Sequence, residues 1–307
     1  MCDKLQMTAV CNLKQRKRKM MITVKDLTYT YPGSAQETLH GLNFEIAEGE
    51  IFGFLGPSGA GKSTTQNILI GLLKAYGGQV SVMGREISQW GQDVYEHIGV
   101  SFELPNHYLK LSARENLDHF RSLYSSPGHD PMEVLAWVDL QEDADKKVEN
   151  FSKGMKVRLN VARSIIHQPK LLFLDEPTTG LDPVNARKIK DLVLELRRQG
   201  TTVFITTHNM MVADELCDRV GFITNGKLSV IDVPSALKKR YGQRAVRVEY
   251  LNGSGGMEQQ EFPLDGLVEN EAFVTLMKTA VQIETLHSLE TTLENIFIEV
   301  TGQELSA

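Results

Sequence analysis

Nine consecutive residues decide the fold of this 307-residue chain: Gly56-Pro57-Ser58-Gly59-Ala60-Gly61-Lys62-Ser63-Thr64. They match the phosphate-binding pattern G-x-x-x-x-G-K-[ST] at every defined position. Residues 51–55 before them form an apolar run of buried-strand length, and apolar residues recur at helical spacing after them, as far as Leu73. Because the pattern needs a strand before it and a helix after it, we expect a loop that binds a polyphosphate rather than a chance glycine-rich turn.

The residue types in this loop each have a physical task. Its glycines let the backbone curl so that successive N–H groups point inward at the phosphates, and the following helix adds its positive end. We expect Lys62 to reach the β- and γ-phosphates and the Ser63 hydroxyl to hold Mg²⁺.

The composition excludes several classes of protein. The net charge of −6 gives no reason to expect nucleic acid as a main partner. Uninterrupted apolar stretches stay far below the roughly eighteen residues of a membrane span, and the first residues lack the apolar core of a signal peptide. The three cysteines form no C-x-x-C pair, which fits a reducing cytoplasm and argues against a disulfide framework or a zinc site.

We expect three regions along the chain. Residues 1–20 carry six Lys or Arg residues against one Asp, so they are predicted to be a basic, disordered tail. Such a charge run is either a solvated extension, which we favour, or a segment attracted to anionic lipid. Residues 21–240 are expected to form one large domain, with a helical subdomain at about 103–165. Residues 241–307 are expected to form a small accessory α+β domain.

Alternating apolar residues at 22–24 and 42–46 predict two strands, with a turn at Pro32-Gly33 between them. Tyr31, beside this turn, either stacks on a purine ring or covers a sheet edge, and its position alone does not decide.

Two start signals predict the helices of the inserted block. Residues 112–115 read as a capping box, and Asp130-Pro131 reads as a helix start with proline at the first helical position. Ser152 stands where an N-cap belongs before a third helix, and Gly154 leaves backbone N–H groups uncovered there. That helix start is a candidate anion site.

Residues 171–174 form an apolar run that ends in Asp175 and Glu176. Ligands bind at the carboxyl ends of parallel strands, so both acids are candidates for the site. Asp175 is placed to hold Mg²⁺ through its water shell, and Glu176 to polarise the water that attacks the γ-phosphate. Residues 202–206 predict another buried strand, which leads to His208. That histidine is either structural or part of the site.

Beyond residue 240 the alternation of helices and strands stops. Alternating residues at 246–250 and an apolar stretch near 281–286 predict two strands. Ser288 is expected to cap a last helix that Gly302 ends, and we expect no catalytic cluster in this region.

Together these stretches resemble the nucleotide-binding subunits of ATP-binding cassette (ABC) transporters, from residue 22 to about residue 235 and in the family's order. Residues 56–64 resemble the Walker A loop, and residues 171–176 resemble Walker B with its catalytic glutamate. Residues 151–155 resemble the signature loop, and residues 180–182 resemble the D-loop. His208 resembles the switch histidine, and Tyr31 resembles the aromatic residue that stacks on adenine. Residues 293–297 resemble the C-terminal extension of bacterial drug and antibiotic exporters.

The resemblance implies an α/β fold: a P-loop NTPase core with an antiparallel β subdomain, an inserted helical subdomain and a small C-terminal α+β appendage. It implies ATP and Mg²⁺ as cofactors. The catalytic residues that it implies are Lys62, Glu176 and His208. The ATP-binding residues are Tyr31, Gly56, Pro57, Ser58, Gly59, Ala60, Gly61, Lys62, Ser63, Thr64, Ser152 and Gly154, and the metal-binding residues are Ser63, Asp175 and Glu103.

Three positions depart from the commonest family pattern. Lys153 and Met155 replace a glycine and a glutamine of the signature, and both changes are frequent in the exporter branch. Glu103 stands where the family usually has a glutamine that contacts Mg²⁺ or the attacking water. Its carboxylate either binds the ion or points to solvent or to a membrane partner. Residues 102–106 are similar to those of fluoroquinolone exporters.

In the family, two subunits pair head to tail, so Ser152 and Gly154 of one face the γ-phosphate bound by the other. The resemblance therefore implies a homodimer, or a pair with a sister subunit. It also implies an ATPase that energises export of a drug or other small hydrophobic compound through a separate integral membrane permease, at the cytoplasmic face of the membrane.

Two alternatives compete with this reading. One is a soluble ABC-type ATPase acting on ribosomes or DNA, against which stand the single cassette and the lack of coiled-coil or zinc insertions. The other is an idle nucleotide sensor, against which stand the intact Lys62, Asp175, Glu176 and His208.

Overall fold

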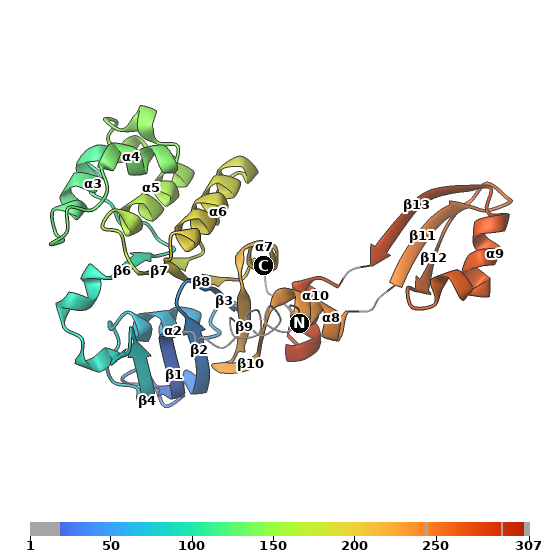
Figure 1. Ribbon diagram of the computed structural model, residues 1–307, viewed down its shortest axis with the longest axis horizontal. Helices are drawn as coiled ribbons and strands as arrows, with labels where there is room; N and C mark the ends of the chain where they lie inside the picture. Colours follow the sequence, from blue (N-terminus) through green and yellow to red (C-terminus); the bar gives the residue numbers. More distant parts are fainter. Residues whose placement is uncertain (1–18, 243–244, 290, 304–307) are drawn as a thin grey trace, which may run out of the picture.

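The computed structural model describes residues 19–242, 245–289 and 291–303. Its centre is a six-stranded sheet with strand order β10-β9-β3-β8-β7-β6, in which the neighbours from β9 to β6 are parallel (Figure 1). The strands are β3 (Ile51–Leu55), β6 (Ile98–Ser101), β7 (Leu171–Asp175), β8 (Thr202–Thr207), β9 (Arg219–Thr224) and β10 (Lys227–Asp232). Because parallel strands end at the same edge of a sheet, the phosphate loop that follows β3 and the two acids at the end of β7 lie at one edge.

Strands β3, β7 and β8 are buried along their whole length, as their continuous apolar runs predict. Successive side chains of β3 enter different cores. Ile51 and Leu55 pack with the helical layer, whereas Phe52 and Phe54 pack with the antiparallel sheet and the helix after the phosphate loop. The two faces of the central sheet thus hold two separate hydrophobic cores.

The predicted antiparallel β subdomain is present. Its sheet has the order β2-β1-β4-β5. The strands are β1 (Met20–Tyr29), β2 (Leu39–Ala47), β4 (Gly77–Val82) and β5 (Arg85–Glu86). The alternation read at residues 22–24 and 42–46 corresponds to paired strands, with Val24 opposite Phe44.

The helix after the phosphate loop is shorter than the sequence suggested. Helix α2 (Lys62–Leu69) ends at Leu69, because Gly71 adopts a left-handed conformation with φ +77°. Leu72, which lies in the stretch expected to be helical, is 55 % exposed.

The inserted helical subdomain contains α3 (Ala113–Arg121), α4 (Pro131–Trp137) and α5 (Lys153–Ile165). Both bonds of the predicted capping box form between Ser112 and Glu115 at the start of α3, and the Asp130 side chain caps α4 as expected. The central sheet is also accompanied by α6 (Pro183–Arg198), α7 (Met210–Leu216) and α8 (Pro234–Tyr241). The described residues also contain short 3-10 helices: η1 (Ile87–Gln89), η2 (Gln92–Glu96), η3 (Gln141–Asp143), η4 (Val148–Asn150) and, in the appendage, η5 (Leu267–Glu269).

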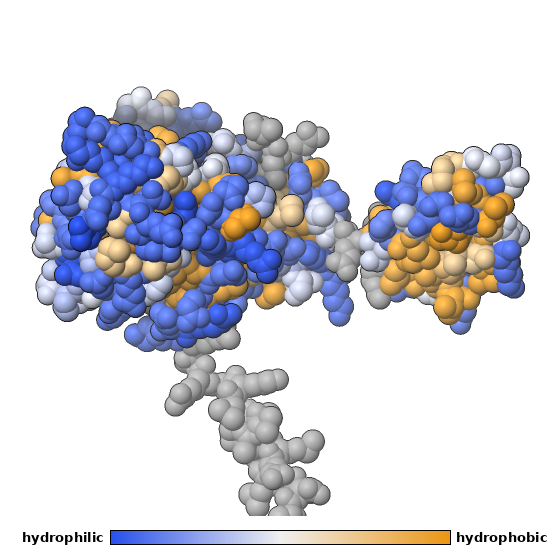
Figure 2. Space-filling view, turned by 90° about the horizontal axis from the view of Figure 1, so that it is seen from above, coloured by the Kyte–Doolittle hydropathy of each residue, from blue (hydrophilic) through white to orange (hydrophobic). Residues whose placement is uncertain are grey.

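The appendage is a three-stranded antiparallel sheet with one helix, drawn apart from the main body in Figure 1. Its elements are β11 (Ala245–Leu251), β12 (Met257–Pro263), α9 (Glu271–Thr279) and β13 (Gln282–Leu289). It has a small core of its own, formed by Val246, Val248, Phe262 and Leu276. In Figure 2, apolar residues gather across the visible face of the appendage, and hydrophilic residues lie at its edges.

The last helix, α10 (Leu293–Thr301), does not pack in the appendage. Leu293, Ile296 and Phe297 are buried in the core of the ATPase body, and the Phe297 ring lies 5.3 Å from that of Phe222 on β9. Thr292 caps this helix, whereas Ser288, the expected cap, belongs to β13. Gly302 ends the helix in a left-handed conformation, as predicted. The appendage is therefore a segment inserted between α8 and α10, which contact one another.

None of the helices in the described ranges is both long and apolar enough to cross a membrane. Most of the predicted basic tail, residues 1–18, lies outside the described residues.

Candidate active site

The phosphate loop has the backbone that its glycines predict. Gly59 and Gly61 have φ values of +78° and +107°, which other residues rarely adopt. Gly56 packs so closely on β9 that a Cβ there would lie 2.1 Å from the carbonyl oxygen of Ile223. Helix α2 starts directly after Gly61, so its free N–H groups face the loop. Strand, loop and helix thus form a cradle for an anion.

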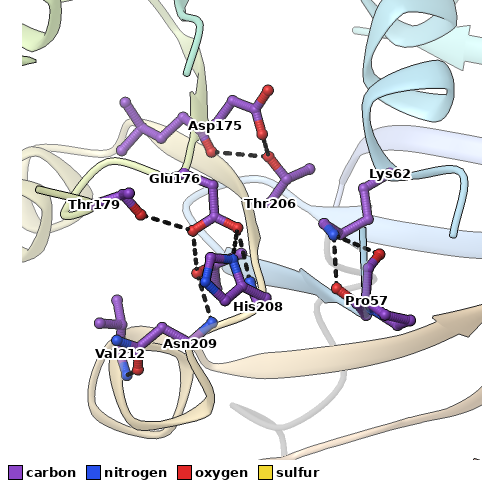
Figure 3. A network of polar contacts seen from close by, with 12 residues as sticks. Pro57, Lys62, Asp175, Glu176, Thr179, Thr206, His208, Asn209 and Val212 are labelled. Atoms are coloured by element: carbon purple, nitrogen blue, oxygen red, sulfur yellow. Dashed lines mark hydrogen bonds and ion pairs between the residues drawn. The ribbon is translucent and has the colours of Figure 1, made fainter. Parts of the chain in front are cut away.

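Lys62 is folded back across this loop. Its Nζ donates to the carbonyl oxygens of Gly56 at 2.6 Å and Pro57 at 2.9 Å (Figure 3). Burial lowers the pKa of Lys62, and the carboxylates of Glu176, Asp175 and Glu103 oppose that shift. The ammonium group is therefore held by weak neutral partners, which phosphate oxygens can replace.

Asp175, the last residue of β7, is 8 % exposed. The Thr206 hydroxyl on β8 donates to its Oδ1 at 2.5 Å. Burial raises the pKa of Asp175, and the charges of Glu103 and Glu176 add to the rise, while the bond from Thr206 opposes it. A buried carboxylate with these neighbours gains from a bound cation, so the donor set fits Mg²⁺. Ser63, a second of the three expected metal ligands, is exposed at the start of α2.

Glu176 is the most constrained side chain of the site. Its backbone has a φ of +48°, uncommon for a residue other than glycine. Its Oε1 accepts from the backbone N–H of His208 at 2.8 Å, and its Oε2 accepts from the hydroxyls of Thr207 at 2.9 Å and Thr179 at 3.2 Å (Figure 3). These donors fix the carboxylate at the edge where β7 and β8 end.

His208 reaches this carboxylate. Its Nδ1 lies 2.6 Å from Glu176 Oε1, and its side chain is 48 % exposed. Of the two roles left open by the sequence, this contact supports the one within the site, because the ring touches the candidate base and also solvent.

Tyr31 lies beside the phosphate loop. Its hydroxyl is 3.1 Å from the Thr64 hydroxyl, its ring packs edge-on against Tyr29, and it is 40 % exposed. The ring is therefore anchored to the first turn of α2 and retains open surface, as a base-stacking residue requires.

Ser152 and Gly154 stand apart from the phosphate loop of their own chain. The Ser152 hydroxyl accepts from the Met155 N–H at the start of α5, and a Cβ on Gly154 would lie 3.4 Å from the Leu181 side chain. Among the described residues, no hydrogen bond or ion pair connects them to residues 56–64.

Glu103 lies at the same sheet edge as the acids, two residues after β6. It acts electrostatically on Asp175 and Lys62, although no group of three His, Cys, Asp or Glu side chains in the described ranges is spaced to hold a metal ion.

Sequence reasoning assigned no role to Thr179, Thr206 or Thr207, whose hydroxyls hold the two acids. The available signal was the position of Thr206 and Thr207 at the carboxyl end of β8, directly before His208.

Comparison with known proteins agrees with this geometry. Residues 39–179 match the family model of the ABC transporter, and residues 244–290 match that of the fluoroquinolone efflux ABC transporter C-terminal domain. A fluoroquinolones export ATP-binding protein of Mycobacterium tuberculosis is 53 % identical over 286 residues, which span 93 % of this chain and 95 % of the relative. The chain belongs to the ABC transporter family, as an ATP-binding protein. The chain is therefore an ATPase, as a member of that family.

Other ABC proteins extend the comparison. The bacitracin transport ATP-binding protein BcrA of Bacillus licheniformis is 39 % identical over 225 residues, 72 % of each chain. A solved dimeric ATP-binding cassette in a post-hydrolysis state, bound to ADP and Pi, superposes with a TM-score of 0.64 at 28 % identity, covering 69 % of this chain and 98 % of that one. The second family match ends before α10, which agrees with the packing of that helix on the ATPase body.

Proposed function

We propose that this ABC ATPase energises export of a drug or other small hydrophobic compound through a separate membrane permease. One observation carries the proposal: similarity to the mycobacterial fluoroquinolones export protein extends over 93 % of the chain, including the appendage. Similarity limited to the ATPase body would support nucleotide chemistry alone.

In the proposed mechanism, Lys62 and the backbone N–H groups of residues 58–64 bind the β- and γ-phosphates. Ser63 and Asp175 would hold Mg²⁺, which would neutralise phosphate charge when bound. Glu176 orients the attacking water and accepts its proton. The hydroxyls of Thr179 and Thr207 keep this carboxylate in one orientation, and His208 contacts both Glu176 and the open side of the site.

The chain has one phosphate loop and one signature, and within the chain Ser152 and Gly154 do not join the loop. We therefore propose that two subunits pair head to tail, as a homodimer or with a sister ATPase. The start of α5 then meets the γ-phosphate on the partner. The solved relative described as a dimeric post-hydrolysis cassette supports this arrangement.

A groove supports docking of a permease. A cavity of about 580 Å³ lies between the central body and the helical subdomain, with a mainly apolar lining. Its lining residues include Leu72, Phe102, His107, Tyr108 and Phe120. The loop that carries Glu103 at the nucleotide edge thus continues directly into the groove. We propose that an amphipathic cytoplasmic helix of the permease fills it, which would keep the ATPase at the cytoplasmic face of the membrane.

Co-purification from membranes tests the proposal. The tagged chain is expected to bring down one integral membrane protein, and Leu72→Glu is expected to abolish this because it places a charge in the groove. Val233→Glu is the matched control, since Val233 is 41 % exposed and lies outside the groove. Recovery of ribosomes or DNA instead, with no membrane protein, would replace the transport function with the soluble alternative.

A further inference from the structure

The register of the central sheet places Glu103 at the same edge as Asp175 and Glu176. Strands β6 and β7 are parallel, and Ser101 lies opposite Leu174. The next residues along both strands therefore lie at the same edge of the sheet: Phe102 and Glu103 after β6, and Asp175 and Glu176 at the end of β7.

A buried amide fixes the start of the Glu103 loop. Asn160 on α5 is 1 % exposed, and its Nδ2 donates to the Ser101 hydroxyl at 3.0 Å and to the Phe102 carbonyl at 2.7 Å. Its Oδ1 accepts from Arg163 at 2.7 Å, so the amide cannot turn without losing these bonds. The backbone that carries Glu103 is thus held beside the phosphate site.

The charges at this edge do not balance. Three carboxylates, those of Glu103, Asp175 and Glu176, act on the ammonium of Lys62, and Glu103 also acts on Asp175. Glu103 is exposed, and within the described ranges it makes no hydrogen bond or ion pair. A metal-free triphosphate would bring further negative charge to this edge, whereas the magnesium complex would bring a cation.

We propose that Glu103 makes nucleotide binding selective for the magnesium complex, by repelling metal-free ATP and attracting the bound cation. The inference rests on the proposed Mg²⁺ site and adds to it a residue that sets which form of ATP is bound. Glutamine at this position would keep the shape and remove both electrostatic effects.

The test measures binding of a fluorescent ATP analogue, with Mg²⁺ and with chelator, to the wild type, Glu103→Gln and Glu142→Gln. Glu142 is exposed in η3 and serves as a control for loss of one carboxylate. For Glu103→Gln, affinity for the metal-free analogue is expected to rise, and the ratio of affinities with and without Mg²⁺ to fall, roughly three- to tenfold. The control is expected to keep the wild-type ratio.

Two further variants separate the possible failures. Glu103→Asp retains the charge, so it is expected to keep a ratio closer to that of the wild type. Equal ratios for the wild type and Glu103→Gln would overturn the role of Glu103 and leave the Mg²⁺ site standing. A wild type indifferent to Mg²⁺ would overturn both. Loss of analogue binding in Lys62→Ala, measured alongside, shows that the signal comes from the phosphate loop.

Discussion

The central sheet and the appendage sheet differ in how far their strands are buried. Strands β3, β7 and β8 are buried on both faces, whereas in β12 Phe262 alone is buried. The polar face of the appendage is solvated and held by side-chain pairs such as Arg247–Glu261 and Thr285–Glu249. A sheet covered on both faces can fix loops at its edge, and all the candidate catalytic groups lie there. The appendage, with its small core, carries none of these candidate groups.

The comparison makes the edge of the central sheet the place where a substitution matters most. Glu176→Gln is expected to lower ATP turnover roughly 10²–10⁴-fold, because the side chain keeps its shape but loses its basicity. ATP binding is expected to persist, and sizing in Mg-ATP should then favour dimers. Normal turnover together with monomers alone would remove Glu176 from catalysis. Glu142→Gln, in η3 of the helical subdomain, is the control for a general effect of charge.

Lys62→Ala is expected to weaken ATP binding about 10- to 150-fold, since a charge-assisted bond to the phosphates is lost. Titration with a fluorescent analogue measures it. Unchanged affinity would show that the loop does not bind phosphate, and would remove the functional difference between the two sheets.

Substitution of two phenylalanines tests whether the core of the ATPase body and the core of the appendage are independent. Phe297→Ala on α10 is expected to destabilise the ATPase body by about 3–5 kcal/mol, because a fully buried ring is removed. Phe273→Ala on α9 removes a ring from the appendage core and should leave the body unchanged. The denaturant midpoint for loss of ATP binding measures both. Equal shifts would mean that the molecule has one cooperative core.

Excision of the appendage should have the smallest effect. Replacement of residues 245–289 by a short glycine–serine linker is expected to leave ATP affinity unchanged, because α8 and α10 already contact one another. Truncation after residue 242, which also removes α10, is the contrasting variant and is expected to destabilise the body. If both variants bind ATP with equal affinity and unfold at the same midpoint, α10 is dispensable.

The sequence predicted the central body well because its signals are local. A glycine-rich loop, an apolar run that ends in two acids, and a capping box each depend on neighbouring residues alone. The appendage was harder: β12 contains Glu258, Gln259, Gln260 and Glu261, which favour a loop rather than a strand. Helix α10 was predicted, but its position was not, because amphipathic spacing does not say which core a helix joins. Two of the three threonines that hold Asp175 and Glu176, Thr206 and Thr207, come from β8, and only the sheet register places them beside the acids.

The return of the chain through α10 has a mechanical consequence. Phe297 leans on Phe222, and Phe222 lies opposite Leu55, the residue directly before the phosphate loop. The next residue of β9, Ile223, packs against Gly56. A pull on the appendage is therefore borne by two anchored ends, and one of them transmits the force through a pair of aromatic rings to the floor of the nucleotide cradle. A domain attached by one end would lack this second connection to the nucleotide site.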